Sequence, residues 1–89
     1  MVGRTYNAAA GTLVGQLIRD HLNARGRSQE EFASAAGVST KHLSQVINGR
    51  SSLGAELAVR IEVETGLSAV MLVALEAARL VEQARGRRG

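Results

Sequence analysis

The sequence lacks cysteine, and this absence removes several kinds of chemistry. Without a thiol the chain can form no disulfide, offers no thiolate to a metal and has no cysteine nucleophile. Proline is also absent, which is compatible with nearly continuous helix because an interior proline would break one. Tyr6 and Phe32 are the only aromatic residues. The hydrophobic core must therefore be built mainly from Leu, Val, Ile and Ala.

Residues for catalysis, metal binding or membrane insertion are scarce as well. Asp20 is the only aspartate, and His21 and His42 lie on separate predicted helices. No metal-ligand spacing, phosphate-binding glycine loop or nucleophile elbow occurs. The longest apolar run, Ala69 to Leu75, is too short for a bilayer, and the N-terminus has no hydrophobic signal core. We expect a cytoplasmic protein with no enzyme activity, metal or cofactor.

Size and charge indicate one small folded domain with an uneven charge distribution. The 89 residues are 45% hydrophobic, an ordinary fraction for a globular protein. The formal net charge of +3 divides into +3 for residues 1–50, −2 for residues 51–75 and +2 for residues 76–89. Positive charge is therefore concentrated in the first half and at the C-terminal end, where it favours a polyanionic partner.

Capping residues and glycines divide the chain into predicted helices, and no strand pattern competes with them. We expect an all-α domain over residues 11–85, preceded by a flexible arm (residues 1–10) and followed by a basic tail (residues 86–89). The five expected helices cover residues 12–25, 28–36, 39–48, 55–65 and 68–85.

The segment from Ser28 to Arg50 is the most informative part of the chain. Ser28 can cap a helix, and Glu31 three residues later completes a capping box. Gly37 follows the last turn, where a left-handed backbone is accessible to glycine, and Ser39 can cap the next helix. Two short helices joined by such a turn form the helix-turn-helix that places its second helix in the major groove of DNA.

The second of these helices has two chemically different sides. At 100° per residue, Leu43, Val46 and Ile47 fall on one side and can anchor the helix. No Asp or Glu occurs between Phe32 and Ala55. An ordinary solvated face is the alternative, but such a face is usually rich in Glu and Lys. Hydroxyl, ammonium and amide groups suit base edges and phosphates, and they fill the opposite side: Thr40, Lys41, Ser44, Gln45 and Asn48.

Residues flanking this polar side are candidates for the DNA backbone. Ser39 leaves a helix N-terminus aimed at DNA, and Arg50 lies just past the helix. His42 projects away from the centre of the polar side, so that phosphate contact and plain solvent exposure both fit. The same two alternatives apply to Arg27. We expect His21 to be a partly buried structural histidine.

The last helix carries more apolar residues than one surface can bury. Leu67, Val70, Met71, Ala74, Ala78 and Val81 form one stripe. We expect one side of the helix to pack on its own domain and another on a second copy or a partner; burial entirely within the chain is the alternative. The residues outside the stripe are the candidates for that interface: Leu72, Val73, Leu75 and Leu80.

The chain resembles the Cro/CI-type helix-turn-helix (XRE) repressor superfamily. The likeness rests on the order of five helices and on Gln29, Ala33, Gly37, Val38, Leu43, Val46, Asn48 and Gly49. Within that superfamily the chain is most similar to antitoxins of HigBA-type toxin–antitoxin modules, through SQEEFASAAGVS, LSQVINGR, ELAVRIEVETGLSA and LEAARL. These segments lie within roughly residues 11–83.

The resemblance implies a lambda-repressor-like fold of five helices, with the helix-turn-helix formed by the second and third. It implies a dimeric repressor on a palindromic operator in double-stranded DNA, and an antitoxin that also binds a ribonuclease toxin. Thr40, Lys41, Ser44 and Gln45 match base-reading positions. Gln29 matches a phosphate-contacting glutamine, and Asn48 and Arg50 match positions that hold the DNA backbone.

The chain departs from the antitoxin pattern in its last helix. Met71 stands where tryptophan is common, and Ala78 with Arg79 where a Tyr-Asp pair is common. The first helix also lacks the preceding Pro-Gly. A phage or host repressor without a toxin therefore remains an alternative, as does a protein-binding module that docks a partner through the last helix.

Overall fold

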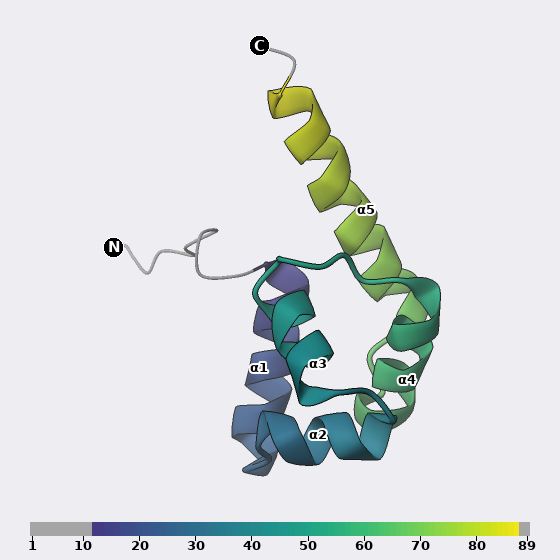
Figure 1. The fold of residues 1–89 in the computed structure, drawn as a ribbon. Helices are drawn as coiled ribbons and strands as arrows, with labels where there is room; N and C mark the ends of the chain where they lie inside the picture. Colours follow the sequence, from purple (N-terminus) through teal and green to yellow (C-terminus); the bar gives the residue numbers. More distant parts are fainter. Residues whose placement is uncertain (1–11, 88–89) are drawn as a thin grey trace, which may run out of the picture.

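The computed structural model describes residues 12–87, which form five α-helices and no strand (Figure 1). The expected N-terminal arm, residues 1–10, lies outside the described residues. The prediction of an all-α fold with five helices is confirmed, although the last helix reaches one residue further than expected. The bounds are α1 Leu13–Arg25, α2 Gln29–Ala36, α3 Thr40–Ile47, α4 Ala55–Thr65 and α5 Ala69–Gly86.

Local capping sets most of these bounds. The Ser28 hydroxyl accepts from Glu31 N at 3.0 Å and the Glu31 carboxylate accepts from Ser28 N at 2.8 Å, which completes the predicted capping box. Ser39 Oγ accepts from His42 N at 3.0 Å at the start of α3. Between α2 and α3, Gly37 has a φ of 76°, the left-handed conformation that favours glycine. The helix-turn-helix geometry thus follows from local sequence.

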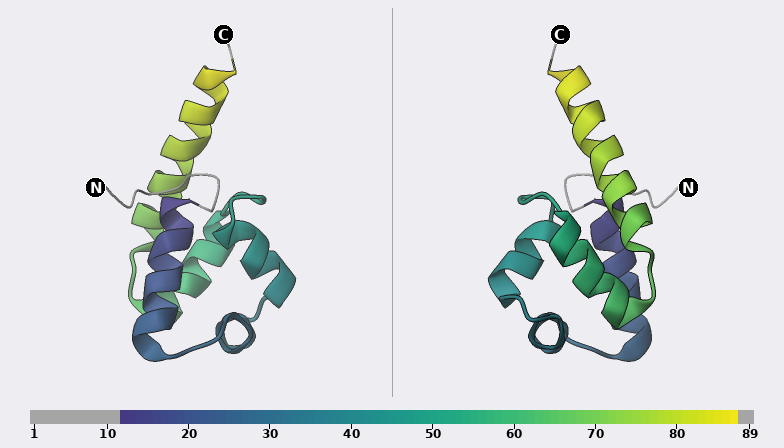
Figure 2. Two further views of the ribbon diagram at one scale, coloured as in Figure 1. Left: turned by 90° about the vertical axis from the view of Figure 1, so that its left-hand side faces the viewer. Right: turned by 90° about the vertical axis from the view of Figure 1, so that its right-hand side faces the viewer.

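Helices α1 to α4 form a compact body, and α5 packs on it with its first half while its second half projects away (Figure 1). Two further views place α3 on one side of α1 and α5 on the other (Figure 2). Helix α1 packs against both α3 and α5. Helices α3 and α5 therefore lie on different sides of α1.

The core combines residues from all five helices around one aromatic ring. Phe32 is fully buried, and the His21 ring meets its edge with 5.9 Å between ring centroids. The other large side chains that are fully buried are aliphatic: Ile18, Leu43, Ile47, Ile61 and Leu72. An aliphatic core was expected from the composition.

Helices α1 and α3 approach each other closely at Gly15. A Cβ atom added to this glycine would lie 2.0 Å from the carbonyl oxygen of Ile47. Because that atom belongs to the backbone, it cannot rotate away as a side chain could. No sequence pattern indicated a role for Gly15, yet its lack of a side chain allows α1 and α3 to pack this closely.

The predicted division of α5 is wrong for Leu72. This side chain is fully buried in the core of its own chain, and Val73 and Leu75 pack against the same core. Apart from Leu67, which packs against the core, the stripe expected to face the domain is instead exposed, with 80% of Val70, 46% of Val81 and 37% of Met71 open to solvent. Of the four predicted interface residues, only Leu80 is an exposed side chain, at 39%.

A buried carboxylate explains why α5 is rotated in this way. Glu76 is only 4% exposed and accepts a hydrogen bond of 2.7 Å from the backbone N–H of Leu53. Arg79 donates to the same carboxylate from Nε at 2.8 Å and from Nη2 at 2.9 Å. The hydrogen bonds from Arg79 are the main cause that holds the Glu76 pKa below its ordinary value; burial opposes them and the Leu53 amide adds to them. Glu76 lies one turn after Leu72, so both face the core together.

None of the helices within residues 12–87 is both long enough and apolar enough to cross a membrane.

Candidate nucleic-acid interface

Helix α3 is anchored by its apolar side. Leu43 and Ile47 have no exposed surface, and Val46 is 2% exposed, as their angular positions predicted. On the outward side Thr40 and Lys41 are exposed, while Ser44 and Gln45 are half-buried. The structure therefore leaves the four predicted base-reading residues accessible on α3, a helix that lies on the other side of α1 from α5 (Figure 2).

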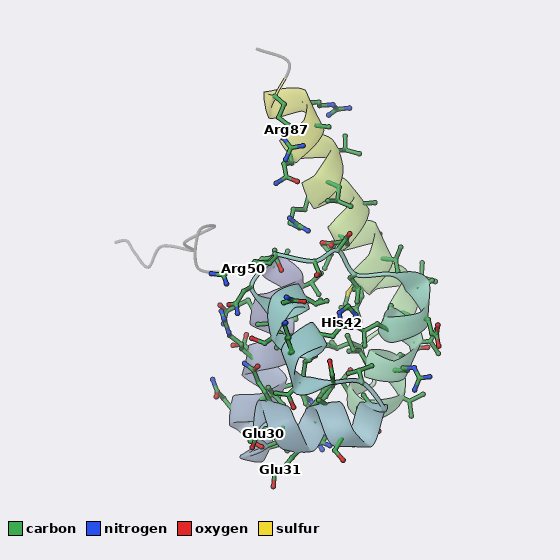
Figure 3. The ribbon with its side chains drawn as sticks, in the orientation of Figure 1. Glu30, Glu31, His42, Arg50 and Arg87 are labelled. Atoms are coloured by element: carbon green, nitrogen blue, oxygen red, sulfur yellow. The ribbon has the colours of Figure 1, made fainter. Side chains whose placement is uncertain are left out.

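The predicted backbone-contacting residues lie at both ends of this surface. Ser39 is exposed at the start of α3, and Arg50 is exposed in the loop after it (Figure 3). His42 is exposed too, but it lies between α3 and α4 (Figure 3) and lines a shallow cavity of about 340 Å³ with Gly37 and Arg60. Since α4 borders this side of α3, His42 is placed at the edge of the exposed surface and away from its centre.

Asn48, which was expected to contact the DNA backbone, makes hydrogen bonds within the chain. Its Oδ1 accepts a hydrogen bond from Arg19 Nη2. Its Nδ2 donates to the backbone oxygen of Ser44 at 3.0 Å and to the Ser44 hydroxyl at 3.4 Å. Both polar atoms of the amide are thus used to hold the C-terminal end of α3.

Arg27, for which phosphate contact and solvent exposure were both expected, has partners within the chain. Its guanidinium lies 5.1 Å from the centroid of the Phe32 ring and pairs with Glu64 at 3.3 Å. A quarter of the side chain is exposed. Because the charge is paired with a carboxylate and stacked on an aromatic face, Arg27 ties the α1–α2 connection to α4. Gln29 lies beside Arg27 at a recess of about 250 Å³ and is half-buried.

Two arginines outside the helix-turn-helix support it and were missed. Arg19 of α1 bonds Asn48 at the end of α3. Arg60 of α4 donates to the backbone oxygen of Ala36 at 2.9 Å, and its Nη1 lies 2.6 Å from where a Cβ of Gly37 would be. These contacts join residues that are 29 and 24 positions apart, so no local sequence pattern predicts them. The sole sequence signal is the glycine at position 37, which leaves room for the Arg60 guanidinium.

His21 is half-buried beside the inward side of α1, as expected. Within residues 12–87 its Nε2 has no hydrogen-bond partner. Burial is the main cause that lowers the His21 pKa, and the charges of Arg25 and Arg27 lower it further. The ring therefore serves as a neutral packing element against Phe32. In the same part of the chain no group of three His, Asp or Glu side chains could hold a metal ion.

The profile of the helix-turn-helix family HTH_3 matches residues 18–72, more than half of the chain. The chain belongs to this helix-turn-helix family. The matched segment contains all of α2, α3 and α4, so that the chain carries a helix-turn-helix DNA-binding domain of the kind found in transcriptional regulators. No curated protein sequence matches the chain.

Solved structures with the same fold include regulators. A candidate antidote protein of a plasmid maintenance system from Nostoc punctiforme is 25% identical, with a TM-score of 0.74, over 84% of each chain. A Pseudomonas aeruginosa protein in complex with its operator DNA (18 bp) is 21% identical, with a TM-score of 0.76, over 85% of this chain and 83% of that one. The clp gene regulator ClgR from Corynebacterium glutamicum is 25% identical, with a TM-score of 0.59, over 91% and 83%. At 21% identity the operator-bound structure shows a shared fold alone.

Proposed function

We propose that this protein is a sequence-specific transcriptional repressor that binds an operator in double-stranded DNA as a homodimer. The observation that carries the proposal is the outward side of α3. Its apolar side is anchored in the core, whereas its accessible side presents hydroxyl, ammonium and amide groups. No carboxylate interrupts the sequence between Phe32 and Ala55, so this surface suits a polyanion.

Each group on this surface has a role that suits its chemistry. Thr40, Lys41, Ser44 and Gln45 read base edges in the major groove. Ser39 and Arg50, at the two ends of α3, bind phosphates, as does Gln29 at the start of α2. His42 contacts a phosphate at the edge of the site. Phosphate contacts give affinity that falls with salt, whereas base contacts decide between sequences.

The corrected rotation of α5 changes the proposed dimer surface. The second half of α5 projects beyond the other helices (Figure 1), and its apolar side chains Leu80 and Val81 are exposed. A helical segment of this length is marginal in water unless something covers its apolar side. A second copy covers Val70, Met71, Leu80 and Val81 in our proposal, while Leu72 stays in the core. A palindromic operator then receives two recognition helices about 34–36 Å apart.

An antitoxin role is the second candidate. It is favoured by the likeness to the candidate antidote protein from Nostoc punctiforme and by the same exposed side of α5. In that case the cytoplasmic repressor controls its own operon, and a ribonuclease toxin occupies the α5 surface. Light scattering of the protein alone distinguishes a second copy from a toxin as the partner of this surface. A stable homodimer would mean that a second copy covers the apolar side chains, whereas a monomer would leave them available to a toxin.

Operator titration tests the repressor proposal. The protein is titrated against labelled DNA from upstream of its own gene and against a randomised library, at two salt concentrations with nonspecific competitor. We expect selection of a site with two symmetric halves and protection of both halves. Equal affinity for all sequences, or protection without symmetry by a monomer, would refute the proposal.

A further inference from the structure

The outward side of α5 carries apolar residues at a spacing that suits packing against a second helix. They recur at alternating intervals of four and three residues, which is the heptad spacing of two helices that lie along each other. All of them are exposed, and we call this row the outer seam: Val70, Ala74, Ala77, Val81 and Ala84. Since the buried Leu72 and Glu76 fall on the opposite side of the helix, the outer seam points away from the body.

The middle of the outer seam is made of small side chains, and its bulkier apolar groups stand toward the ends. The distance between two packed helices depends on the side chains at their contact, so Ala74 and Ala77 allow a close approach. Met71 and Leu80 lie on either edge of the seam and are 37% and 39% exposed. They would widen the apolar contact around the alanines.

Charges at the two ends of α5 have opposite signs. At the start of the helix, the exposed Glu62 accepts a hydrogen bond of 3.1 Å from the backbone N–H of Ala69. At its end, Arg85 and Arg87 are exposed. Residues 51–75 carry a net charge of −2 and residues 76–89 a net charge of +2. A second copy that runs in the opposite direction therefore brings its basic end against this acidic start, and two-fold symmetry repeats the match at the other end.

A second copy that runs in the same direction fits these charges poorly. It would bring the arginines of both copies together at one end of the pair and both Glu62 side chains together at the other. The macrodipoles of the two helices would also lie side by side with like ends together. An antiparallel pair avoids this repulsion, and it places the two bodies of α1 to α4 at opposite ends of the pair, which separates the recognition helices as two half-sites require.

Resting on the proposed homodimer, we infer that two copies pair antiparallel along the outer seam of α5, with the basic end of each α5 against the acidic start of the other. The two-fold axis passes near Ala77, the middle of the seam. The occupant is a second copy because the ends of the helix complement each other in charge. Such a contact uses the same surface on both copies and closes at two.

Distances between spin labels test the direction of pairing. The chain lacks cysteine, so one introduced cysteine per copy can be labelled without background. Met71→Cys and Ala78→Cys lie about two helical turns apart on the same edge of the seam, so both labels have a similar sideways distance to the partner helix. In the antiparallel pair the two labels at position 71 should lie about 15 Å farther apart along the helix axis than those at position 78. A parallel pair would give nearly equal distances.

Charge reversal tests the basic end without touching the seam. Arg85→Glu brings a carboxylate against the acidic start of the second copy, so the dimer Kd at low salt should rise about 3- to 30-fold, and less at high salt. In a parallel pair the same change replaces one like-charge contact by another and should leave the Kd unchanged. Arg25→Glu is the matched control, because it makes the same charge change at an exposed position of α1. Analytical ultracentrifugation measures each Kd, and thermal unfolding shows that each variant is folded.

The outcomes separate the pairing from the proposed function. Equal label distances at the two positions, or an Arg85→Glu dimer as tight as that of Arg25→Glu, overturn the antiparallel pairing and leave the homodimer in place. Where a label itself dissociates the dimer in light scattering, the charge reversal decides alone. A wild-type protein that stays monomeric overturns both the pairing and the homodimer, and it leaves the outer seam to a different protein.

Discussion

Gly15→Ala is the sharpest test of how α3 is positioned. The new Cβ would lie 2.0 Å from the Ile47 carbonyl oxygen and 2.9 Å from its carbonyl carbon. Carbon and oxygen atoms that are not bonded to each other normally lie about 3.3 Å or more apart. Helix α3 must therefore move by about 1 Å, which costs about 1–3 kcal/mol or more in a packed core. Alanine has a higher helix propensity than glycine, which offsets this cost by up to about 1 kcal/mol. The net loss should be about 1–2 kcal/mol, or about 5–15 °C in Tm for a domain of this size.

Urea and thermal unfolding followed by circular dichroism measure this loss, and Gly86→Ala is the matched control. Gly86 is also helical, but nothing lies within 4 Å of where its Cβ would be, so this variant should unfold within about 0.5 kcal/mol of the wild type. If Gly15→Ala is as stable as Gly86→Ala, the close approach of α1 and α3 is not the constraint described above.

Four further substitutions test other parts of the structure. Glu76→Gln should lower the free energy of unfolding by about 1–3 kcal/mol, because Arg79 loses its buried charge partner. The folded-state pKa of Glu76 lies below 4.5, so its contribution is complete above that value and is lost as pH falls through the folded-state pKa; urea midpoints of the wild type should fall there more steeply than those of the variant. Gln45→Ala should cost about 1–3 kcal/mol of binding and relax specificity at one base pair in operator titrations. Arg50→Ala should weaken binding to all sequences alike and reduce the slope of log K against log salt by about one; sequence-blind losses in both variants would contradict these roles. Val81→Glu should dissociate the homodimer in light scattering, and a dimer that persists would place the interface elsewhere.

What could be predicted from the sequence was mostly local. Ser28, Ser39 and Gly37 act within three or four residues of their own position, so the bounds of α2 and α3 followed from their spacing. The rotation of α5 could not be predicted in that way. It depends on a hydrogen bond between Glu76 and the backbone of Leu53, 23 positions earlier. The apolar stripe on the other side of α5 had indicated that the opposite side of the helix would face the core.

The candidate site, too, could be predicted only as far as local sequence patterns reach. The polar side of α3 followed from angular spacing, but periodicity does not show that Asn48 is bound by Arg19 or that Arg27 pairs with Glu64. Each of these bonds joins side chains that are far apart in the sequence, by 29 and 37 positions. The sequence therefore did not indicate that these two expected DNA contacts also have partners within the folded chain.

The long-range bonds also connect the two proposed surfaces. The loop between α3 and α4 is held at its start by Arg19 through Asn48 and near its end by Glu76 through Leu53. Arg50 lies between these two fixed points, so its position depends on α1 and on α5 together. Because Glu76 and Arg79 sit on the helix that carries the proposed dimer surface, a shift of α5 would move the loop after the recognition helix. If the proposed function is right, this buried carboxylate couples dimer formation to the phosphate contact of Arg50.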